Sequence, residues 1–189
     1  MKIKLARNLQ SDSIVDGEGI RTVIWTQGCS HNCAGCHNPD THNFNGGFSK
    51  NIDELKEEIK GLKLQDGITF SGGDPMFQVE ACNEIAKFCK EINLNVWCYT
   101  GFTFEQLIIM SNINPLIKEF LTNIDVLIDG KFKIELKSYD LQFRGSSNQR
   151  IIDVKKSLEK NKVIEITKFD IKNNKYNLFN YSHIDKVYI

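Results

Sequence analysis

The 189-residue sequence lacks a long apolar run, an apolar N-terminal stretch and an excess of either charge. No run approaches the ~20 apolar residues that a bilayer-spanning helix needs. The first seven residues, MKIKLAR, do not form the apolar core of a signal peptide. The 24 basic side chains balance 24 acidic ones, so no overall field attracts nucleic acid or an anionic membrane. We therefore expect a cytoplasmic protein with neither nucleic acid nor membrane as a partner.

Repeats, linkers and low-complexity tracts are also missing, so the sequence shows no domain boundary. A chain of this length, with 41% hydrophobic residues, can bury a substantial core without disulfides. In a reducing compartment its six cysteines are expected to be thiols or metal ligands. The sequence predicts a single domain over residues 1–189.

Strand and helix patterns alternate along the first two thirds of the chain. The expected strands are 20–26, 67–70, 94–99 and 125–129, and the expected helices are about 51–60, 78–91 and 104–121, the last broken near Pro115. This alternation predicts parallel strands with right-handed crossovers. Four clear units are too few for a closed eight-stranded barrel of ~250 residues. We therefore predict an α/β fold, an open partial (β/α) barrel of about six or fewer units with parallel strands.

The remaining segments give weaker signals. Residues 28–47 read as a long loop, and a loop of that length inside a domain is usually functional. Residues 151–154 are a candidate further strand. Residues 163–189 alternate apolar with polar side chains around Asn173-Asn174, which predicts a C-terminal β-hairpin extension.

The most informative feature is a group of three cysteines in the long loop. Cys29, Cys33 and Cys36 have the spacing C-x3-C-x2-C, and thiolates are soft ligands that suit iron–sulfur clusters, zinc or copper. Most cubane clusters take four protein thiolates, so three local cysteines leave one iron open to an outside ligand. An open coordination position is typical of catalytic metal sites.

Two other interpretations of these cysteines stay open. A structural zinc site could add a histidine from the same loop (His31, His37 or His42), although the usual zinc knuckle begins with C-x2-C and has a second pair. A ferredoxin-like carrier would need a fourth nearby cysteine, which the sequence lacks. Cys82, Cys89 and Cys98 are predicted not to be ligands, because buried free cysteines are common and the first two share an apolar helix face.

A glycine-rich turn follows the expected strand at 67–70. The sequence Ser71-Gly72-Gly73-Asp74-Pro75 links that strand to a helix, at the edge where α/β sheets bind ligands. By itself such a turn is more often only a turn. Two glycines allow close backbone approach and expose groups that can hold the ends of an amino acid, and Asp74 could receive an ammonium group.

Taken with these motifs, the sequence resembles a known family. Residues 28–39 (GCSHNCAGCHNP) are similar to the cluster loop of radical S-adenosylmethionine enzymes, and among these to the glycyl-radical-enzyme activases. Four further stretches, 15–21 (VDGEGIR), 71–75 (SGGDP), 125–132 (DVLIDGKF) and 143–150 (FRGSSNQR), occur in the order and rough spacing of the activases of anaerobic ribonucleoside-triphosphate reductase. The resemblance covers about residues 10–154, and the tail 155–189 departs from it.

The resemblance implies a 4Fe–4S cluster and S-adenosylmethionine as cofactors. Cys29, Cys33 and Cys36 would be the metal ligands, and the fourth iron would be chelated by the amino and carboxylate groups of S-adenosylmethionine. The implied cofactor-binding residues are Gly35, Cys36, His37, Gly72, Gly73, Asp74 and Asp129. Gly35 replaces the aromatic residue that many members stack on adenine, so other groups must hold adenine; His37 is a candidate, or else a loop histidine exposed to water. Asp129 could touch the ribose or a cation, with a solvated strand-end carboxylate as the alternative.

The implied activity is the formation of a glycyl radical on an anaerobic (class III) ribonucleoside-triphosphate reductase polypeptide. A flavodoxin- or ferredoxin-type donor would reduce the cluster, and cleavage of S-adenosylmethionine would give a 5′-deoxyadenosyl radical that takes hydrogen from a glycine. Such chemistry belongs to the cofactors and needs no side-chain acid or base. Two alternatives are an activase of another glycyl radical enzyme, such as a formate-lyase, and a non-catalytic metal-binding adaptor.

Overall fold

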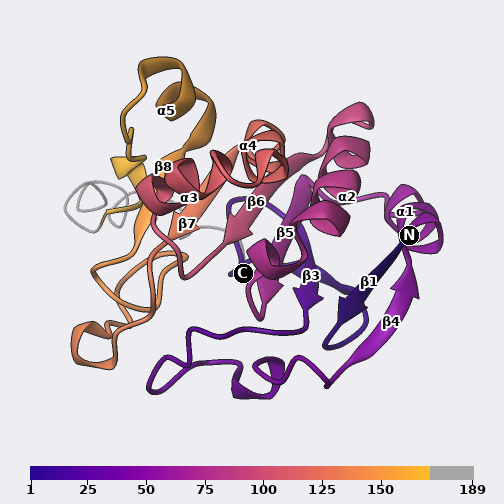
Figure 1. Ribbon diagram of the computed structural model, residues 1–189, viewed down its shortest axis with the longest axis horizontal. Helices are drawn as coiled ribbons and strands as arrows, with labels where there is room; N and C mark the ends of the chain where they lie inside the picture. The colour runs from indigo at the N-terminus through magenta and orange to yellow at the C-terminus, as the bar shows by residue number, and fades with distance from the viewer. Residues whose placement is uncertain (171–189) are drawn as a thin grey trace, which may run out of the picture.

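Four parallel strands form the centre of an eight-stranded sheet (Figure 1). They are β3 (Arg21–Thr26), β5 (Gly67–Gly72), β6 (Asn95–Tyr99) and β7 (Val126–Asp129), adjacent in that order. The computed structural model describes residues 1–170. All four strands fall within one or two residues of the ranges expected from sequence, because long apolar runs bounded by turn residues are a strong local signal.

The outer strands run antiparallel to their neighbours, so the prediction of a wholly parallel sheet is wrong at its edges. These strands are β1 (Lys2–Leu5), β2 (Gln10–Ser13), β4 (Phe48–Asn51) and β8 (Arg150–Asp153). The segment between β7 and β8 holds no α-helix to serve as a parallel crossover. In the described part of the chain the sheet runs from β4 to β8 without closing on itself.

Five α-helices accompany the sheet within residues 1–170. They are α1 (Ile52–Lys60), α2 (Val79–Glu91), α3 (Phe104–Ser111), α4 (Pro115–Thr122) and α5 (Val154–Lys160), with 3-10 turns η1 (Pro39–Thr41), η2 (Pro75–Gln78), η3 (Ile134–Leu136) and η4 (Thr167–Phe169). Asn51 is the N-cap of α1: its side chain accepts a hydrogen bond from the backbone N–H of Asp53. The break expected at Pro115 separates α3 from α4, where the side chain of Asn114 caps the second helix.

Alternating strand side chains divide the core into two parts. On one face Val96, Cys98 and Leu127 pack with the apolar sides of α1, α2 and α4. On the other face Trp97 and Ile128 pack with aromatic residues of loops rather than helices. Because successive strand residues point to opposite faces, the same alternation decides which polar residues at the strand ends reach the open face.

Arg21 closes the N-terminal edge of the parallel strands. It is 1% exposed, and its five N–H groups donate to Thr69, Asn95 and the carbonyls of Glu18, Ile68 and Asn95. Burial lowers the pKa of this guanidinium to about 10. Thr69 in turn donates to the carbonyl of Asp16 at 2.8 Å, so this network fixes the segment before β3 against the sheet.

The C-terminal part of the chain is only partly described. Residues 163–170 add an isolated bridge between Ile152 and Glu165 and the turn η4. The rest of the predicted hairpin, including Asn173-Asn174, lies outside the described residues. Within residues 1–170, no helix combines the length and apolar character that crossing a bilayer requires.

Candidate active site

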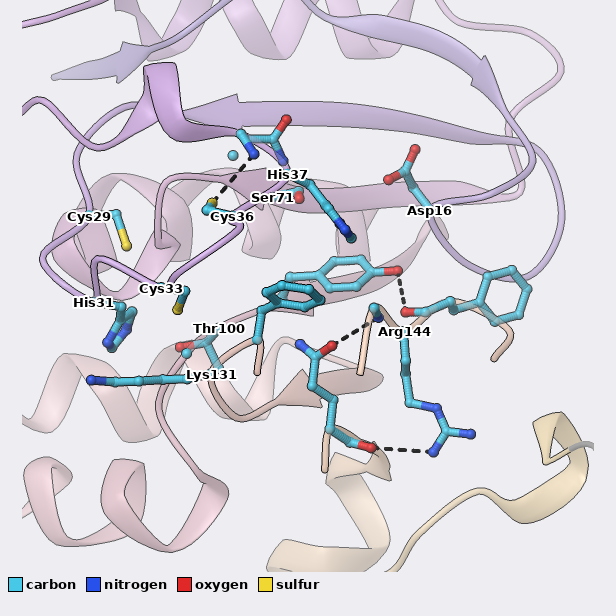
Figure 2. A pocket seen from close by; sticks show the side chains of 18 of the residues that line it. Asp16, Cys29, His31, Cys33, Cys36, His37, Ser71, Thr100, Lys131 and Arg144 are labelled. Carbon is cyan, nitrogen blue, oxygen red and sulfur yellow. Dashed lines mark hydrogen bonds between the residues drawn. The ribbon is translucent and has the colours of Figure 1, made fainter. Parts of the chain in front are cut away.

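A cavity of about 580 Å³ opens where the parallel strands end (Figure 2). Its lining comes from the loop after β3, the glycine turn after β5, the residues after β6 and β7, and the segments 14–16 and 141–149. Binding sites of α/β sheets form at this carboxyl edge because the connecting loops there converge. The cavity is large enough for a cofactor-sized ligand.

The three cysteines of the long loop all line this cavity. Cys29, Cys33 and Cys36 are free thiols of intermediate exposure, and Figure 2 shows them on the same side of it. The start of the loop is held because Cys29 N–H donates to the carbonyl of His42. Cys36 N–H donates to the carbonyl of Cys33, and this hydrogen bond closes a turn between the last two cysteines. The backbone N–H of Asn38 donates to Cys36 Sγ at 3.4 Å.

The protein alone does not activate the thiols of Cys29 and Cys33. Burial, and to a lesser extent nearby acidic groups, raises the pKa of Cys29, and burial followed by the neighbouring Cys36 raises that of Cys33. The ammonium of Lys131 acts in the opposite direction on Cys33. A coordinated thiol is deprotonated by the metal's own charge, so these thiols suit ligation rather than nucleophilic chemistry.

The donor set fits an iron–sulfur cluster. Thiolates are the usual protein ligands of such clusters, and each binds a separate iron, so the three sulfurs need not meet at one point. Within residues 1–170 no three Cys, His, Asp or Glu side chains are arranged to hold a single metal ion. Cys82, Cys89 and Cys98 are fully buried on the helix side of the sheet, as part of its core. Burial raises the pKa of all three thiols, to about 12 for Cys89.

The glycine-rich turn faces the cavity at the end of β5. Gly72 and Gly73 both line it. Gly72 has φ +102°, and a Cβ there would lie 2.6 Å from the carbonyl oxygen of Thr26, so only glycine fits. The next two backbone N–H groups donate to the carbonyls of Thr26 and Gly28. The turn is thereby fastened directly to the start of the cysteine loop.

Asp74 and Asp129, which the resemblance implies as cofactor-binding residues, are not among the residues that line the cavity. Each is 1% exposed. The carboxylate of Asp74 accepts hydrogen bonds from Met76, Thr100 and Gly101 and lies 2.6 Å from His31 Nε2. Asp129 follows the alternation that turns Leu127 toward the helices, so its carboxylate points to the covered face.

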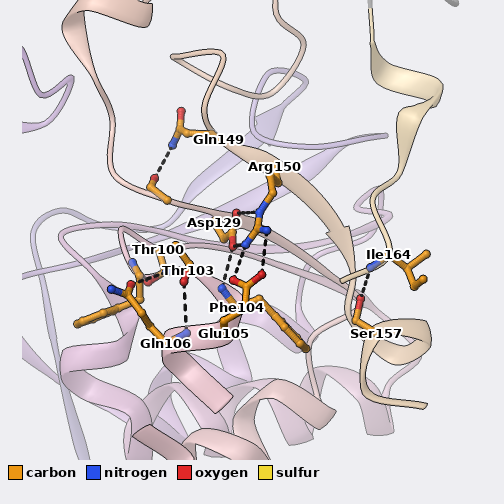
Figure 3. Close-up of polar contacts among 12 residues, drawn as sticks. Thr100, Thr103, Phe104, Glu105, Gln106, Asp129, Gln149, Arg150, Ser157 and Ile164 are labelled. Carbon is orange, nitrogen blue, oxygen red and sulfur yellow. Dashed lines mark hydrogen bonds and ion pairs between the residues drawn. The ribbon is translucent and has the colours of Figure 1, made fainter. Parts of the chain in front are cut away.

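Arg150 is the principal partner of Asp129 (Figure 3). Its Nε donates to Oδ1 at 3.0 Å and its Nη2 to Oδ2 at 2.5 Å. The backbone of Phe104, at the start of α3, donates to the same carboxylate at 2.8 Å. The other edge of the guanidinium meets the exposed carboxylate of Glu105. Asp129 therefore joins β7, β8 and α3.

His37 lines the cavity, whereas Gly35 is not among the lining residues. The ring of His37 packs against Phe132 with centroids 4.9 Å apart. Gly35 faces the loop after β7, where a Cβ would lie 2.8 Å from Ile134 Cδ1. The cluster loop and the loop after β7 are therefore in direct contact at both residues.

Several cavity residues were not assigned a role from the sequence. Thr100 directly follows β6, and Lys131 is the second residue after β7; their position after strand ends was the signal that could have identified them. Asp16 and Arg144 belong to motif stretches whose chemistry was not evident. Figure 2 shows these two on the side of the cavity away from the cysteines.

The stretch 143–150 builds one wall of the cavity. The Gln149 side chain accepts from the backbone of Gly145 and donates to the carbonyl of Gly130. Phe143, at φ +56°, is held by a hydrogen bond from the Tyr99 hydroxyl to its carbonyl at 2.9 Å and by edge contacts to Trp97. The motif thus fastens the wall loop to the end of β7 and to β6.

Comparison with known proteins gives a consistent picture. Residues 15–152 match the family model described as a 4Fe-4S single cluster domain. The anaerobic ribonucleoside-triphosphate reductase-activating protein of Escherichia coli (strain K12) is 34% identical over 145 residues, which cover 72% of this chain and 90% of that protein. The protein of the same name from Enterobacteria phage T4 is 36% identical over 147 residues, 72% of this chain and 86% of that protein.

A shorter match involves a second kind of activase. The pyruvate formate-lyase-activating enzyme of Clostridium pasteurianum is 43% identical over 89 residues, covering 44% of this chain and 37% of that protein.

Proposed function

Because the chain belongs to the family of anaerobic ribonucleoside-triphosphate reductase-activating proteins, and carries their 4Fe-4S single cluster domain, we propose that it activates an anaerobic ribonucleoside-triphosphate reductase by forming a glycyl radical on it. The protein is a radical S-adenosylmethionine oxidoreductase. Its cofactors are a 4Fe–4S cluster and S-adenosylmethionine.

Three thiolates would hold the cluster: Cys29, Cys33 and Cys36 would each bind one iron, leaving the fourth to the amino and carboxylate groups of S-adenosylmethionine. When bound and reduced, the cluster would supply one electron for the cleavage of a carbon–sulfur bond of S-adenosylmethionine. Methionine and a 5′-deoxyadenosyl radical would result, and that radical would take a hydrogen atom from the reductase glycine. The protein's part is to position the reactants and to keep water from them.

Different cavity residues would contact different parts of S-adenosylmethionine. Gly72 and Gly73 expose backbone to the ligand without a side chain between. The ammonium of Lys131 would suit the carboxylate of S-adenosylmethionine, and His37, which also lines the cavity, would contact its adenosine part. Asp74 and Asp129 act from behind the cavity, by holding the loops that line it.

One observation carries the proposal: three thiols line a cavity that none of the chain's other thiols lines. All six cysteines of the chain lie in the described region, and the other three are fully buried in the core. A cluster held here therefore keeps one iron free of cysteine, as a site that chelates a substrate requires.

Several finer features belong to the same proposal. We take residues 1–189 as one domain whose open sheet is part of a (β/α) barrel, with one side free for a polypeptide substrate. The electron donor is of the flavodoxin or ferredoxin type, and the protein works in the cytoplasm.

Anaerobic reconstitution tests the proposal. The wild-type protein is expected to bind iron and sulfide near four per chain and, on reduction, to form methionine and 5′-deoxyadenosine. Cys33→Ala is expected to lose both the cluster and the cleavage, whereas Cys82→Ala, a matched cysteine in the core, keeps them and loses only about 1 kcal/mol of stability. Stoichiometric zinc without cleavage, or an active Cys33→Ala protein, would refute it.

The partial match to a pyruvate formate-lyase-activating enzyme supports one alternative, in which the target is another glycyl radical enzyme. Electron paramagnetic resonance of anaerobic mixtures distinguishes the two. A glycyl doublet on the reductase supports the proposal, and a doublet formed on a formate-lyase but not on the reductase supports the alternative.

A further inference from the structure

The side chain of His31, in the loop that carries the three cysteines, is nearly buried. His31 lies between the first two cysteines of the motif, and its side chain is only 7% exposed. Its Nε2 is not directed at the thiols but lies 2.6 Å from Asp74 Oδ2. A carboxylate can only accept, so the ring nitrogen donates.

Asp74 is arranged to receive this one side chain. A carboxylate offers about four acceptor positions. The backbone N–H groups of Met76 and Gly101 each occupy one, at 2.9 Å, and the Thr100 hydroxyl donates to the same group. The position left is taken by His31, and the carboxylate has no exposed edge.

Aromatic side chains and a glycine fix the ring itself. The centroid of Phe102 lies 4.5 Å from that of His31, edge to face, and the centroid of Phe77 lies 5.8 Å away. Gly101 touches the ring so closely that a Cβ there would collide with it. The imidazole therefore has one position open to it, with its nitrogen on Asp74.

We propose that His31 and Asp74 are positioning residues, which hold the cysteine loop in the arrangement that the cluster needs before the cluster is bound. This inference rests on the proposed function. The chain from Cys29 to Cys36 forms neither helix nor strand, and Asn32 adopts a left-handed conformation at φ +48°. Such a loop has little intrinsic order, so an anchor near its middle removes conformational freedom that the cluster would otherwise have to restrict.

The pair also joins the two halves of the cofactor site. Asp74 holds the loop twice, through its carboxylate on His31 and through its backbone N–H on the carbonyl of Gly28 at 3.0 Å. It directly follows Gly72 and Gly73, which line the cavity. The thiols and the glycine turn are thus set relative to each other by one residue, as outer-shell partners orient ligands in other metal sites.

Three variants of the full chain test this role. His31→Phe keeps an aromatic ring but removes the donor, and His31→Gln restores a donor. Glu58→Gln is a matched control. Glu58 lies on α1, away from the cavity, and the substitution removes the negative charge of its ion pair with Lys50 of β4. After anaerobic reconstitution, the measurements are the rate of iron transfer to a chelator, the electron paramagnetic resonance of the reduced cluster with and without S-adenosylmethionine, and the KM and kcat for its cleavage per cluster.

His31→Phe is expected to weaken cluster retention about tenfold to a hundredfold, in line with the loss of outer-shell partners elsewhere, and to raise KM for S-adenosylmethionine with an altered resonance. His31→Gln should recover most of both, and Glu58→Gln should match the wild type. Wild-type retention and spectra in His31→Phe would overturn the proposal, as would a His31→Gln protein no better than His31→Phe. If His31→Phe does not fold, Asp74→Asn serves in its place, and wild-type retention there overturns it. Failure of the wild-type protein to form a cluster would instead refute the proposed function, and this inference with it.

Discussion

Arg150 binds two carboxylates that differ in burial. Comparing Arg150→Met, which loses both ion pairs, with Glu105→Gln, which loses only the exposed one, separates their contributions to stability. Asp129 is 1% exposed, whereas the Glu105 side chain is 56% exposed. In Arg150→Met the buried carboxylate loses both bonds from the guanidinium and keeps only the N–H of Phe104. The exposed carboxylate is left in water.

The expected cost follows from that difference. Removing one partner of a buried ion pair costs about 3–5 kcal/mol, because an uncompensated charge stays behind. Losing the exposed pair costs about 0.2–1 kcal/mol. Arg150→Met loses both pairs, about 3–6 kcal/mol in all. For a chain of this size each kcal/mol lowers the melting temperature by about 2–4 °C, so Arg150→Met should melt about 6–24 °C below the wild type. Glu105→Gln should melt within about 4 °C of it.

Thermal unfolding of the protein without cluster, followed by circular dichroism, measures these differences in melting temperature. The double variant Arg150→Met/Asp129→Asn should be more stable than Arg150→Met alone, because the residue left buried is then neutral. The reasoning is refuted if Glu105→Gln costs as much as Arg150→Met, or if neutralising Asp129 in the double variant gives no recovery.

Three further predictions concern stability. Hydrogen bonds from Arg150 lower the pKa of Glu105 from 4.5 to about 2. The contribution of this ion pair to the free energy of unfolding is therefore fully present above pH 4.5 and is lost as pH falls through about 2. The difference in unfolding free energy between wild type and Glu105→Gln should therefore shrink over that range, and a constant difference would contradict this. Tyr99→Phe removes the hydrogen bond to the carbonyl of Phe143 and should cost about 0.5–1.5 kcal/mol in urea unfolding; no measurable cost would show that the bond contributes nothing. Asn51→Ala removes the N-cap of α1 and should cost about 1 kcal/mol by the same assay, with unchanged stability as the contrary result.

Local signals identified most of the secondary structure. The apolar run at 125–129 and the proline at 115 produced a strand and a helix break within a residue or two of their expected places. Strand β2 gave no such signal, because its sequence QSDS carries no apolar alternation, and the alternation of β1 (KIKL) extends over only four residues. They form because the edge of β3 supplies hydrogen-bond partners, and that edge lies elsewhere in the sequence.

Side-chain direction at the strand ends was the harder problem. The sequence placed Asp74 and Asp129 correctly at the carboxyl edge of the sheet, but it could not say which side of that edge they face. Packing decides this. Asp129 is drawn to Arg150, 21 residues further along the chain, and Asp74 to His31, 43 residues before it.

By itself the sequence determined the chemistry that this protein has available: three cysteines close enough in the chain to share one loop, and two glycines after a strand that leave backbone exposed. Both follow from spacing along the chain, which folding cannot alter. Only the tertiary structure decided which polar residues face the cavity and which hold its walls. That choice depends on contacts between segments that are distant in sequence, because a buried carboxylate is stable only where enough donors surround it.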